Sequence, residues 1–219
     1  MKTQARVVVI GGGVVGCSVL YHLTKAGWRD VVLVERDILT SGSTWHAAGG
    51  VTTLNSDANV SRLQKYTFDL YRELEAVTSQ SCGIHHNGGF YLAASDGQMD
   101  FLKLIHSRAR TLGMDTEMIS VADAKARNAL IDERHFTGAL WREDGGYVDP
   151  WLVTQAYVTA ARRLGAEVQR FTKVEALVQR PDRTWDVVTD KGIINAEHVV
   201  NAGGLWAREV GRLVGLELP

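Results

Sequence analysis

Three glycines stand at the spacing G-x-G-x-x-G where an apolar run ends and a helical pattern begins. Gly11, Gly13 and Gly16 follow the β-branched run of residues 6–10 and open residues 14–26, whose apolar side chains recur at helical spacing. Glycine at these positions permits a tight turn, close approach of the backbone to a pyrophosphate, and close packing of the helix on the strand. The glycines therefore predict a strand, turn and helix that can bind a dinucleotide.

An acidic residue follows at the distance that such a turn requires. Glu35 ends a second apolar run, residues 31–35, and stands 19 residues after the last glycine of the turn. Its carboxylate can accept hydrogen bonds from the ribose hydroxyls of an adenosine. The N–H groups of Val14 and Val15 would face the phosphates at the positive end of the helix dipole. These features predict a dinucleotide site but leave the dinucleotide open.

Two further segments have the composition of cofactor-binding loops. Residues 39–50, LTSGSTWHAAGG, are rich in hydroxyls, small side chains and glycines, and they directly follow the second strand. Far downstream, residues 199–206 have the pattern of another strand that ends in a glycine turn and the start of a helix. A loop that can wrap an extended cofactor, together with a second glycine turn, favours FAD over NAD.

The elements that position these residues follow from hydrophobic periodicity. Helices are expected over residues 60–78, 97–112 and 150–164, and strands over residues 89–94, 137–141, 167–171, 174–179, 185–189 and 193–201. The first two helices carry apolar stripes, made of Val60, Leu63, Leu70 and Leu74 in one and of Phe101, Ile105 and Leu112 in the other. Asp149 and Pro150 open the third helix, because Asp caps free N–H groups and Pro is tolerated at the first helical position.

This order of elements predicts an α/β protein with two domains. A Rossmann-like domain is expected to comprise residues 1–80 and 149–219, interrupted by an inserted α+β portion, residues 81–148. The chain has 24 Lys and Arg against 25 Asp and Glu, a net charge of −1. Nucleic acid and anionic membrane surfaces are therefore not expected as partners, because both require clustered cations. No run of about 18 apolar residues predicts a membrane span.

Over its whole length the chain resembles the N-terminal, FAD-binding part of the D-amino-acid-oxidase-like amine oxidoreductases. Within that family it is most similar to the dimethylglycine and sarcosine dehydrogenases and dimethylglycine oxidase. The resemblance is carried by the glycine fingerprint, Glu35-Arg36, GSTWHAAG at residues 42–49, GGYVDP at 145–150 and NAGGLW at 201–206. The GSTWHAAG loop is specific to this group, whereas the other motifs are shared across the superfamily. The resemblance implies that the inserted portion is part of a substrate domain and that the chain is truncated at its C-terminus, before further substrate-domain and folate-binding portions.

The resemblance also implies which residues bind FAD. They are Gly11, Gly13, Val14, Val15, Gly16, Glu35, Arg36, Gly42, Ser43, Thr44, Trp45, His46, Ala47, Ala48, Gly49, Gly50, Val174, Gly203, Gly204 and Trp206. In the most similar members the histidine matching His46 is bonded covalently to the 8α-methyl of FAD. The alternative is a histidine that only hydrogen-bonds within a tight loop. The chain departs from the family at Gly203, where many members have alanine.

The implied reaction is oxidation of an N-methyl amine such as dimethylglycine or sarcosine. The flavin would accept a hydride equivalent, leaving an iminium that hydrolyses or passes its one-carbon unit to tetrahydrofolate, bound in a C-terminal part outside this chain. Oxygen or an electron-transfer protein would reoxidise the flavin. Two alternatives stay open: a general amino-acid or glycine oxidase, which normally lacks a histidine at position 46, and a cofactor-binding fragment without turnover of its own. No catalytic side chain is assigned within these residues.

The remaining reactive side chains are expected to be structural. Cys82, His85 and His86 are of metal-ligating types, but a fourth ligand at zinc-like spacing is missing, so no metal site is predicted. Cys17 lies in an apolar helix, and two cysteines cannot form a disulfide framework, which favours a reducing compartment. Met1 stands five residues before the predicted strand that starts at residue 6, so we expect a bacterial-type cytoplasmic protein with no signal or transit peptide.

Overall fold

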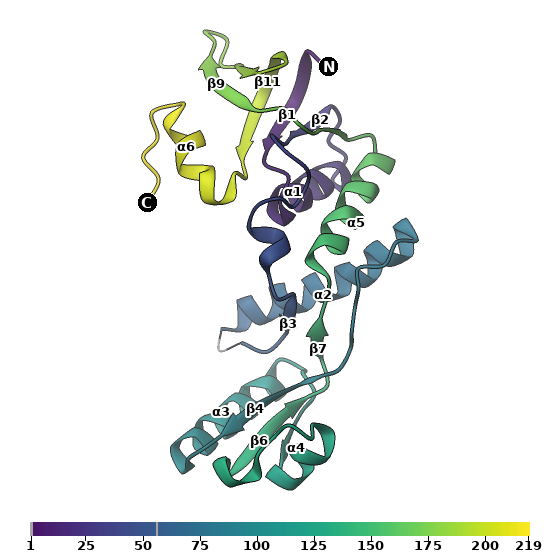
Figure 1. Ribbon diagram of the computed structural model, residues 1–219, viewed down its shortest axis with the longest axis vertical. Coiled ribbons are helices and arrows are strands. Elements are labelled where there is room, and N and C mark those ends of the chain that lie inside the picture. The colour runs from purple at the N-terminus through teal and green to yellow at the C-terminus, as the bar shows by residue number, and fades with distance from the viewer. Residues whose placement is uncertain (1, 56) are drawn as a thin grey trace. The chain divides into compact units, whose positions relative to one another are not determined.

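The computed structural model describes residues 2–55 and 57–219, whose contacts divide the chain into two units (Figure 1). The first unit comprises Met1–Ala48, Leu74–Cys82 and Asp149–Pro219, and the second comprises Gly49–Glu73 and Gly83–Val148. The sequence pattern placed residues 49–73 in the first domain, whereas their contacts group them with the second unit. Several contacts tie this segment to the second unit: β3 (Gly50–Thr52) is antiparallel to β7 (Gly145–Tyr147), Leu54 shares a buried cluster with Leu140, and the Phe68 ring contacts that of His86. Assignment of these units to a cofactor and a substrate domain stays a prediction.

The first unit is built on a six-stranded sheet in the order β8-β2-β1-β11-β10-β9. These strands are β1 (Gln4–Ile10), β2 (Val31–Val34), β8 (Glu167–Gln169), β9 (Val174–Gln179), β10 (Trp185–Thr189) and β11 (Gly192–Asn201). β1 pairs in parallel with β2 and β11, β2 pairs in parallel with β8, and β10 is antiparallel to β9 and β11. Val7, Val8 and Val9 are 2% exposed or less, so β1 is buried on both faces, as expected for a central parallel strand.

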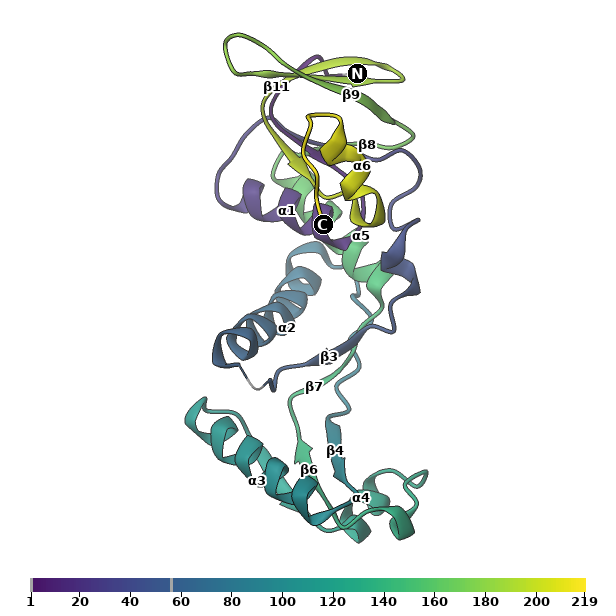
Figure 2. The ribbon, with the colours of Figure 1, turned by 90° about the vertical axis from the view of Figure 1, so that its left-hand side faces the viewer.

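Three helices accompany this sheet. α1 (Val14–Lys25) contacts α5 (Pro150–Arg163), and α6 (Ala207–Arg212) follows β11 and contacts it (Figures 1 and 2). Val210 and Val214 pack against the cluster that includes Val8 and Ile10, on one face of β1. Because side chains alternate along a strand, Val7 and Val9 point to the opposite face.

α5 begins where the Asp-Pro pair predicts. The Asp149 carboxylate accepts hydrogen bonds from the N–H groups of Trp151 at 2.8 Å and Leu152 at 3.1 Å, and Pro150 is the first helical residue. The strand predicted over residues 167–171 ends earlier, at Gln169. Phe171 has a φ of +54°, a left-handed conformation that cannot continue a strand.

The second unit contains two small sheets. Beside the β3–β7 pair, β4 (Gly89–Ala93), β6 (Gly138–Arg142) and β5 (Thr116–Ile119) form an antiparallel sheet in the order β4-β6-β5. Leu140 belongs to a cluster with α3 (Asp96–Thr111), and its neighbour Ala139 belongs to a cluster with α4 (Val121–Arg127). The two helices therefore cover opposite faces of this sheet. α2 (Ala58–Thr78) and the 3₁₀ turn η2 (Glu133–His135) complete the elements of this part of the sequence.

The predicted apolar stripes are buried only in part. In α2, Leu70 and Leu74 are 2% and 0% exposed, but Val60 and Leu63 are 40% and 63% exposed. In α3, Phe101 is 56% exposed although it was placed on the stripe. Helical spacing identifies a face, but which turns of that face find partners depends on the tertiary structure. Among the described residues, no helix is long and apolar enough to cross a membrane.

Candidate cofactor site

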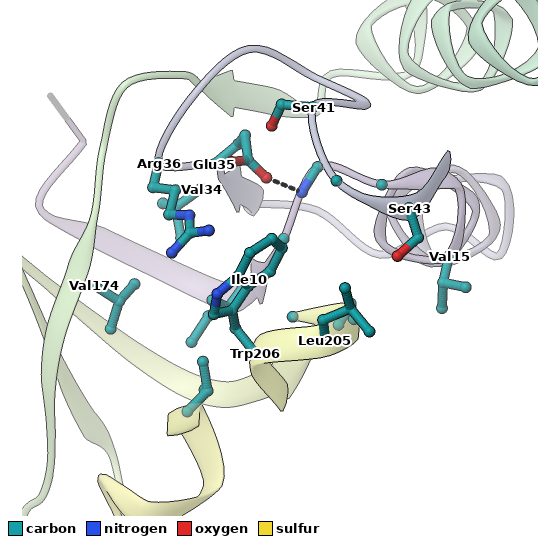
Figure 3. A pocket seen from close by; sticks show the side chains of 18 of the residues that line it. Ile10, Val15, Val34, Glu35, Arg36, Ser41, Ser43, Val174, Leu205 and Trp206 are labelled. Carbon is teal, nitrogen blue, oxygen red and sulfur yellow. Dashed lines mark hydrogen bonds between the residues drawn. The ribbon is translucent and has the colours of Figure 1, made fainter. Parts of the chain in front are cut away.

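The carboxyl ends of β1, β2 and β11 meet at one edge of the first sheet, and a cavity of about 650 Å³ opens there (Figure 3). It is lined by Ile10, Gly11, Gly12, Gly13, Val14, Val15, Val34, Glu35, Arg36, Ser41, Gly42, Ser43, Thr44, Ala47, Thr172, Lys173, Val174, Glu175, Ala202, Gly203, Gly204, Leu205, Trp206, Glu209, Val210 and Leu213. Its volume lies within the range of about 300–1,000 Å³ typical of small-molecule sites. Edges of this kind, between neighbouring parallel strands, are where α/β sheets bind ligands.

Two glycines of the first turn are required for close packing. A Cβ on Gly11 would overlap the carbonyl oxygen of Ala202, and a Cβ on Gly16 would overlap the carbonyl oxygen of Gly11. Gly11 also has a φ of +113°, which side-chain-bearing residues rarely adopt. The first glycine turn therefore lies directly against the turn that follows β11, and both border the cavity.

Glu35 is held at the end of β2 by backbone donors. Its Oε2 accepts the N–H of Gly12 at 2.6 Å, the bond drawn in Figure 3, and its Oε1 accepts the N–H of Asp37 at 2.9 Å. The N–H of Thr172 donates to the Glu35 carbonyl oxygen at 2.8 Å. Each carboxylate oxygen has further acceptor capacity, so the anchored group can still accept hydrogen bonds from a pair of hydroxyls.

The N-terminus of α1 borders the cavity, since Gly13, Val14 and Val15 line it. The first turn of α1 contains no Asp or Glu, and its N-cap, Gly13, has no side chain to accept a bond. The N–H of Val14 donates to the Thr44 hydroxyl at 3.0 Å, so the residue 40–47 loop reaches this helix end. Helix N-termini of this kind bind anionic groups such as phosphates.

A flat cation–aromatic pair forms another part of the wall. The Arg36 guanidinium carbon lies 3.9 Å from the centre of the Trp206 ring, and both side chains face the cavity in Figure 3. A Cβ on Gly42 would lie 3.3 Å from the indole, so glycine leaves room for Trp206 at this point. A Cβ on Gly203 would lie 3.2 Å from the Ala207 nitrogen, so an alanine there requires only a small shift.

His46 lies in the 3₁₀ turn η1 (Ser43–His46), which follows Gly42. Its Nδ1 is 3.0 Å from the carbonyl oxygen of Gly42, and its ring centroid is 4.4 Å from that of Trp45. Both side chains are exposed, and neither lines the cavity, although Ser43, Thr44 and Ala47 of the same loop do.

Most of the predicted site residues come together around this one cavity. Those that line it are Gly11, Gly13, Val14, Val15, Glu35, Arg36, Gly42, Ser43, Thr44, Ala47, Val174, Gly203, Gly204 and Trp206. Those that do not are Gly16, Trp45, His46, Ala48, Gly49 and Gly50, of which the last two belong to the second unit. That these residues bind a cofactor stays a prediction.

The structure also adds lining residues that the sequence pattern missed. They are Ile10, Gly12, Val34, Ser41, Thr172, Lys173, Glu175, Ala202, Leu205, Glu209, Val210 and Leu213. Many are direct neighbours of predicted residues in the sequence. The sequence could have predicted that Glu209, Val210 and Leu213 line the cavity together, because their spacing places them on one face of the helix that follows the second glycine turn.

Both cysteines are buried, and the two histidines near Cys82 pack against aromatic rings. Burial raises the pKa of Cys17 to about 12, with a smaller contribution from the negative charge of Glu35. Burial, followed by the charge of Glu75, raises the pKa of Cys82 to about 12. The His85 ring stacks on Tyr147 and that of His86 contacts Phe68. Within residues 2–55 and 57–219, no group of three or more His, Cys, Asp or Glu side chains is arranged to hold a metal ion.

Known proteins are similar to this chain in sequence, and a solved structure is similar to it in fold. Dimethylglycine dehydrogenase, mitochondrial, from Rattus norvegicus is 40% identical over 220 residues, covering 100% of this chain and 25% of that protein. Sarcosine dehydrogenase, mitochondrial, from Mus musculus is 35% identical over 225 residues, covering 100% and 24%. The crystal structure of L-proline dehydrogenase from P. horikoshii matches with a TM-score of 0.91 at 27% identity, covering 100% of this chain and 58% of that one.

The chain thus spans about a quarter of the length of these two curated relatives. The predicted resemblance and the predicted α/β fold are both confirmed by these matches. The family of FAD dependent oxidoreductases named DAO matches residues 6–219, and the chain belongs to this family.

Proposed function

We propose that the chain is the FAD-binding part of an oxidoreductase that oxidises the CH–NH group of N-methyl amino acids, with dimethylglycine or sarcosine as substrate and the flavin attached covalently to His46. The observation that carries the proposal is the loop of residues 42–47. It combines cavity-lining residues with an exposed histidine, in a chain similar to dimethylglycine and sarcosine dehydrogenases.

The residues around the cavity fit FAD. Glu35, anchored on Gly12, would accept hydrogen bonds from the adenosine ribose, and the N-terminus of α1 at Val14 would meet the pyrophosphate. Arg36 and Trp206 offer a flat surface and a positive charge next to the ribose position. No acidic residue in the first turn of α1 opposes the phosphates.

When bound, FAD would supply the oxidising ring that takes a hydride equivalent from the substrate's N-methyl group. The chain's own residues bind and orient the cofactor for this step. The substrate class is supported by the names of the similar dehydrogenases, and the substrate-binding side chains are not assigned within these residues. The acceptor that reoxidises the flavin, oxygen or an electron-transfer protein, and a role for tetrahydrofolate are expectations from the same resemblance.

The covalent link joins an imidazole nitrogen of His46 to the carbon of the flavin 8α-methyl. A C–N bond forms, one C–H bond of the methyl breaks, and the imidazole loses its proton. In this reaction FAD would supply the electrophilic carbon and would accept the electron pair of the broken C–H bond together with two protons, dioxygen would be the terminal oxidant and be reduced to hydrogen peroxide, and His46 would supply the nitrogen of the new bond. A neutral imidazole is a competent nucleophile for this reaction.

Mass spectrometry of the denatured intact protein tests the link. We expect the polypeptide mass to include one FAD, and a tryptic peptide containing His46 to carry it. His46→Ala should release all flavin on acid precipitation while the fold is kept, because an exposed loop side chain contributes little to the core. Free flavin from folded, FAD-loaded wild-type protein would exclude the covalent link and leave a noncovalent site.

Substrate-dependent bleaching of the flavin absorbance tests the reaction. Under anaerobic conditions, the intact protein is mixed in turn with dimethylglycine, sarcosine and glycine. We expect reduction by the two N-methyl amines and little by glycine. Faster reduction by glycine would favour an amino-acid oxidase, and no reduction by any amine would favour a cofactor-binding role without turnover.

A further inference from the structure

Residues 79–88 connect α2 to β4, and near their end stands Asn87-Gly88, the only Asn-Gly pair in the sequence. Neither residue belongs to a helix or strand, and Asn87 is exposed. An asparagine can react with its own backbone, because the amide nitrogen of the next residue can attack the side-chain carbonyl carbon. Glycine favours this attack, since it has no side chain that shields its nitrogen or restricts its backbone.

Both groups that would react are free of hydrogen bonds. Within the part of the chain that the structure describes, the Asn87 side chain has no hydrogen-bond partner, and the N–H of Gly88 has no acceptor. A bond to the side chain would fix its torsions, and a bond to the N–H would have to break before the nitrogen could attack. Neither cost opposes the reaction at this position.

Other asparagines of the chain are better protected. Asn128 is also exposed and outside helices and strands, but its Oδ1 accepts the N–H of Leu130 at 3.1 Å, and the residue after it is Ala129. Asn195 and Asn201 lie in β11, where pairing with β1 fixes the backbone. Asn128 is therefore the natural comparison, because it matches Asn87 in exposure but differs in both reacting groups.

We propose that Asn87 is a site of spontaneous deamidation. The nitrogen of Gly88 forms a bond to the side-chain carbonyl carbon of Asn87, and the side-chain nitrogen leaves as ammonia with the proton that Gly88 gives up. The product is a five-membered succinimide. Water then hydrolyses one of the two C–N bonds of the ring. Opening on one side gives aspartate, and opening on the other gives isoaspartate, in which the backbone runs through the former side chain.

The modification falls between two backbone pairings of the second unit. His85 exchanges two hydrogen bonds with Tyr147, at 2.8 and 3.1 Å, and Gly89 pairs with Arg142 at the start of β4. Isoaspartate adds one carbon to the backbone between these two fixed points, whereas aspartate adds only a charge to an exposed side chain. Isoaspartate should therefore destabilise the second unit, and aspartate should not.

The experiment ages the intact, freshly purified protein at pH 7 and at pH 8. Peptide mass spectrometry with electron-transfer fragmentation distinguishes asparagine, aspartate and isoaspartate at residue 87, and follows Asn128 in the same samples. Asn87→Gln is the unreactive variant, since the longer side chain would have to form a less favourable six-membered ring, and Asn87→Asp represents one product. Gly88 is kept, because a Cβ there would overlap the Trp141 indole.

We expect Asn87 to lose its amide at least about tenfold faster than Asn128, a difference of about 1.4 kcal/mol in the barrier. The rate should rise with the hydroxide concentration, because the attacking nitrogen must lose its proton. An Asn87 amide that stays intact, or is lost no faster than that of Asn128, overturns the inference.

Urea unfolding tests the effect of the added backbone carbon. Aged wild-type protein that contains isoaspartate should unfold at a lower urea concentration than Asn87→Asp, and ageing should leave the midpoint of Asn87→Gln unchanged. Equal midpoints for aged wild type and Asn87→Asp would overturn the effect assigned to isoaspartate. None of these measurements depends on the cofactor or on the substrate.

Discussion

Substitution of Glu35 by Gln tests whether this carboxylate binds the adenosine end of FAD. Gln keeps one carbonyl oxygen, which can still accept the Gly12 N–H now bonded to Oε2 at 2.6 Å. It removes the negative charge and one of the two acceptor oxygens. The variant should therefore retain the glycine turn while weakening the hydrogen bonds to the ribose.

The size of the effect follows from the bonds at stake. A hydrogen bond to a charged group contributes about 1.5–3 kcal/mol, and about 1.4 kcal/mol corresponds to a tenfold change in affinity. Loss of one such bond weakens FAD binding by about 10-fold to 150-fold. Glu35 is only partly buried, so we expect a value near the lower end. Glu35→Ala should cost more, because it also leaves the Gly12 N–H without its acceptor.

The assay is a flavin fluorescence titration in a His46→Ala background, where no covalent bond can hide a change in affinity. Asp37→Asn is the control, because this exposed carboxylate is two residues away and does not line the cavity. It should change affinity less than about twofold. FMN, which lacks the adenosine, should bind equally well with Glu35 and with Gln. An equal loss of FMN and FAD affinity would refute a ribose contact.

Three further predictions concern stability and reactivity. Gly16→Ala should lower the free energy of unfolding of the first unit by about 3 kcal/mol in urea, because its Cβ would overlap a backbone carbonyl. Gly97→Ala in α3 is the control: a Cβ there has no atom within 4 Å, so the change should be neutral or stabilising by up to about 1 kcal/mol. Equal urea midpoints for the two variants would contradict this prediction. Asp149→Ala removes two N-cap bonds and should cost about 0.5–2 kcal/mol by the same measurement, while Asp149→Asn should keep most of the stability. Burial raises the pKa of Cys17 and of Cys82 to about 12, so the thiolate is scarce at pH 8 and iodoacetamide should modify neither cysteine until urea unfolds the protein. Mass spectrometry that finds rapid labelling of the native protein would show that these thiols are accessible.

Local patterns were sufficient for the central part of the fold. The strands expected over residues 174–179 and 185–189 are β9 and β10 with the same bounds. Gly11 and Gly13 lie in the turn between β1 and α1, and Glu35 follows β2, as the sequence pattern predicted. These features depend on residues close in sequence, through strand alternation, helix caps and the conformational freedom of glycine. The strand β5 and the helix α4 were missed, because with four and seven residues they are too short for a clear hydrophobic period.

What the sequence by itself determined was the first half of the site: a glycine turn, an acidic residue at the end of β2, and a loop containing His46. The tertiary structure decided how the site is closed. Parallel pairing of β1 with β2 and β11 sets Glu35 and the turn before Trp206 on either side of the first glycine turn. Sheet order arises from long-range packing and leaves no periodic trace in the sequence. For the same reason, only the structure brings Arg36 against Trp206, 170 positions away in the chain.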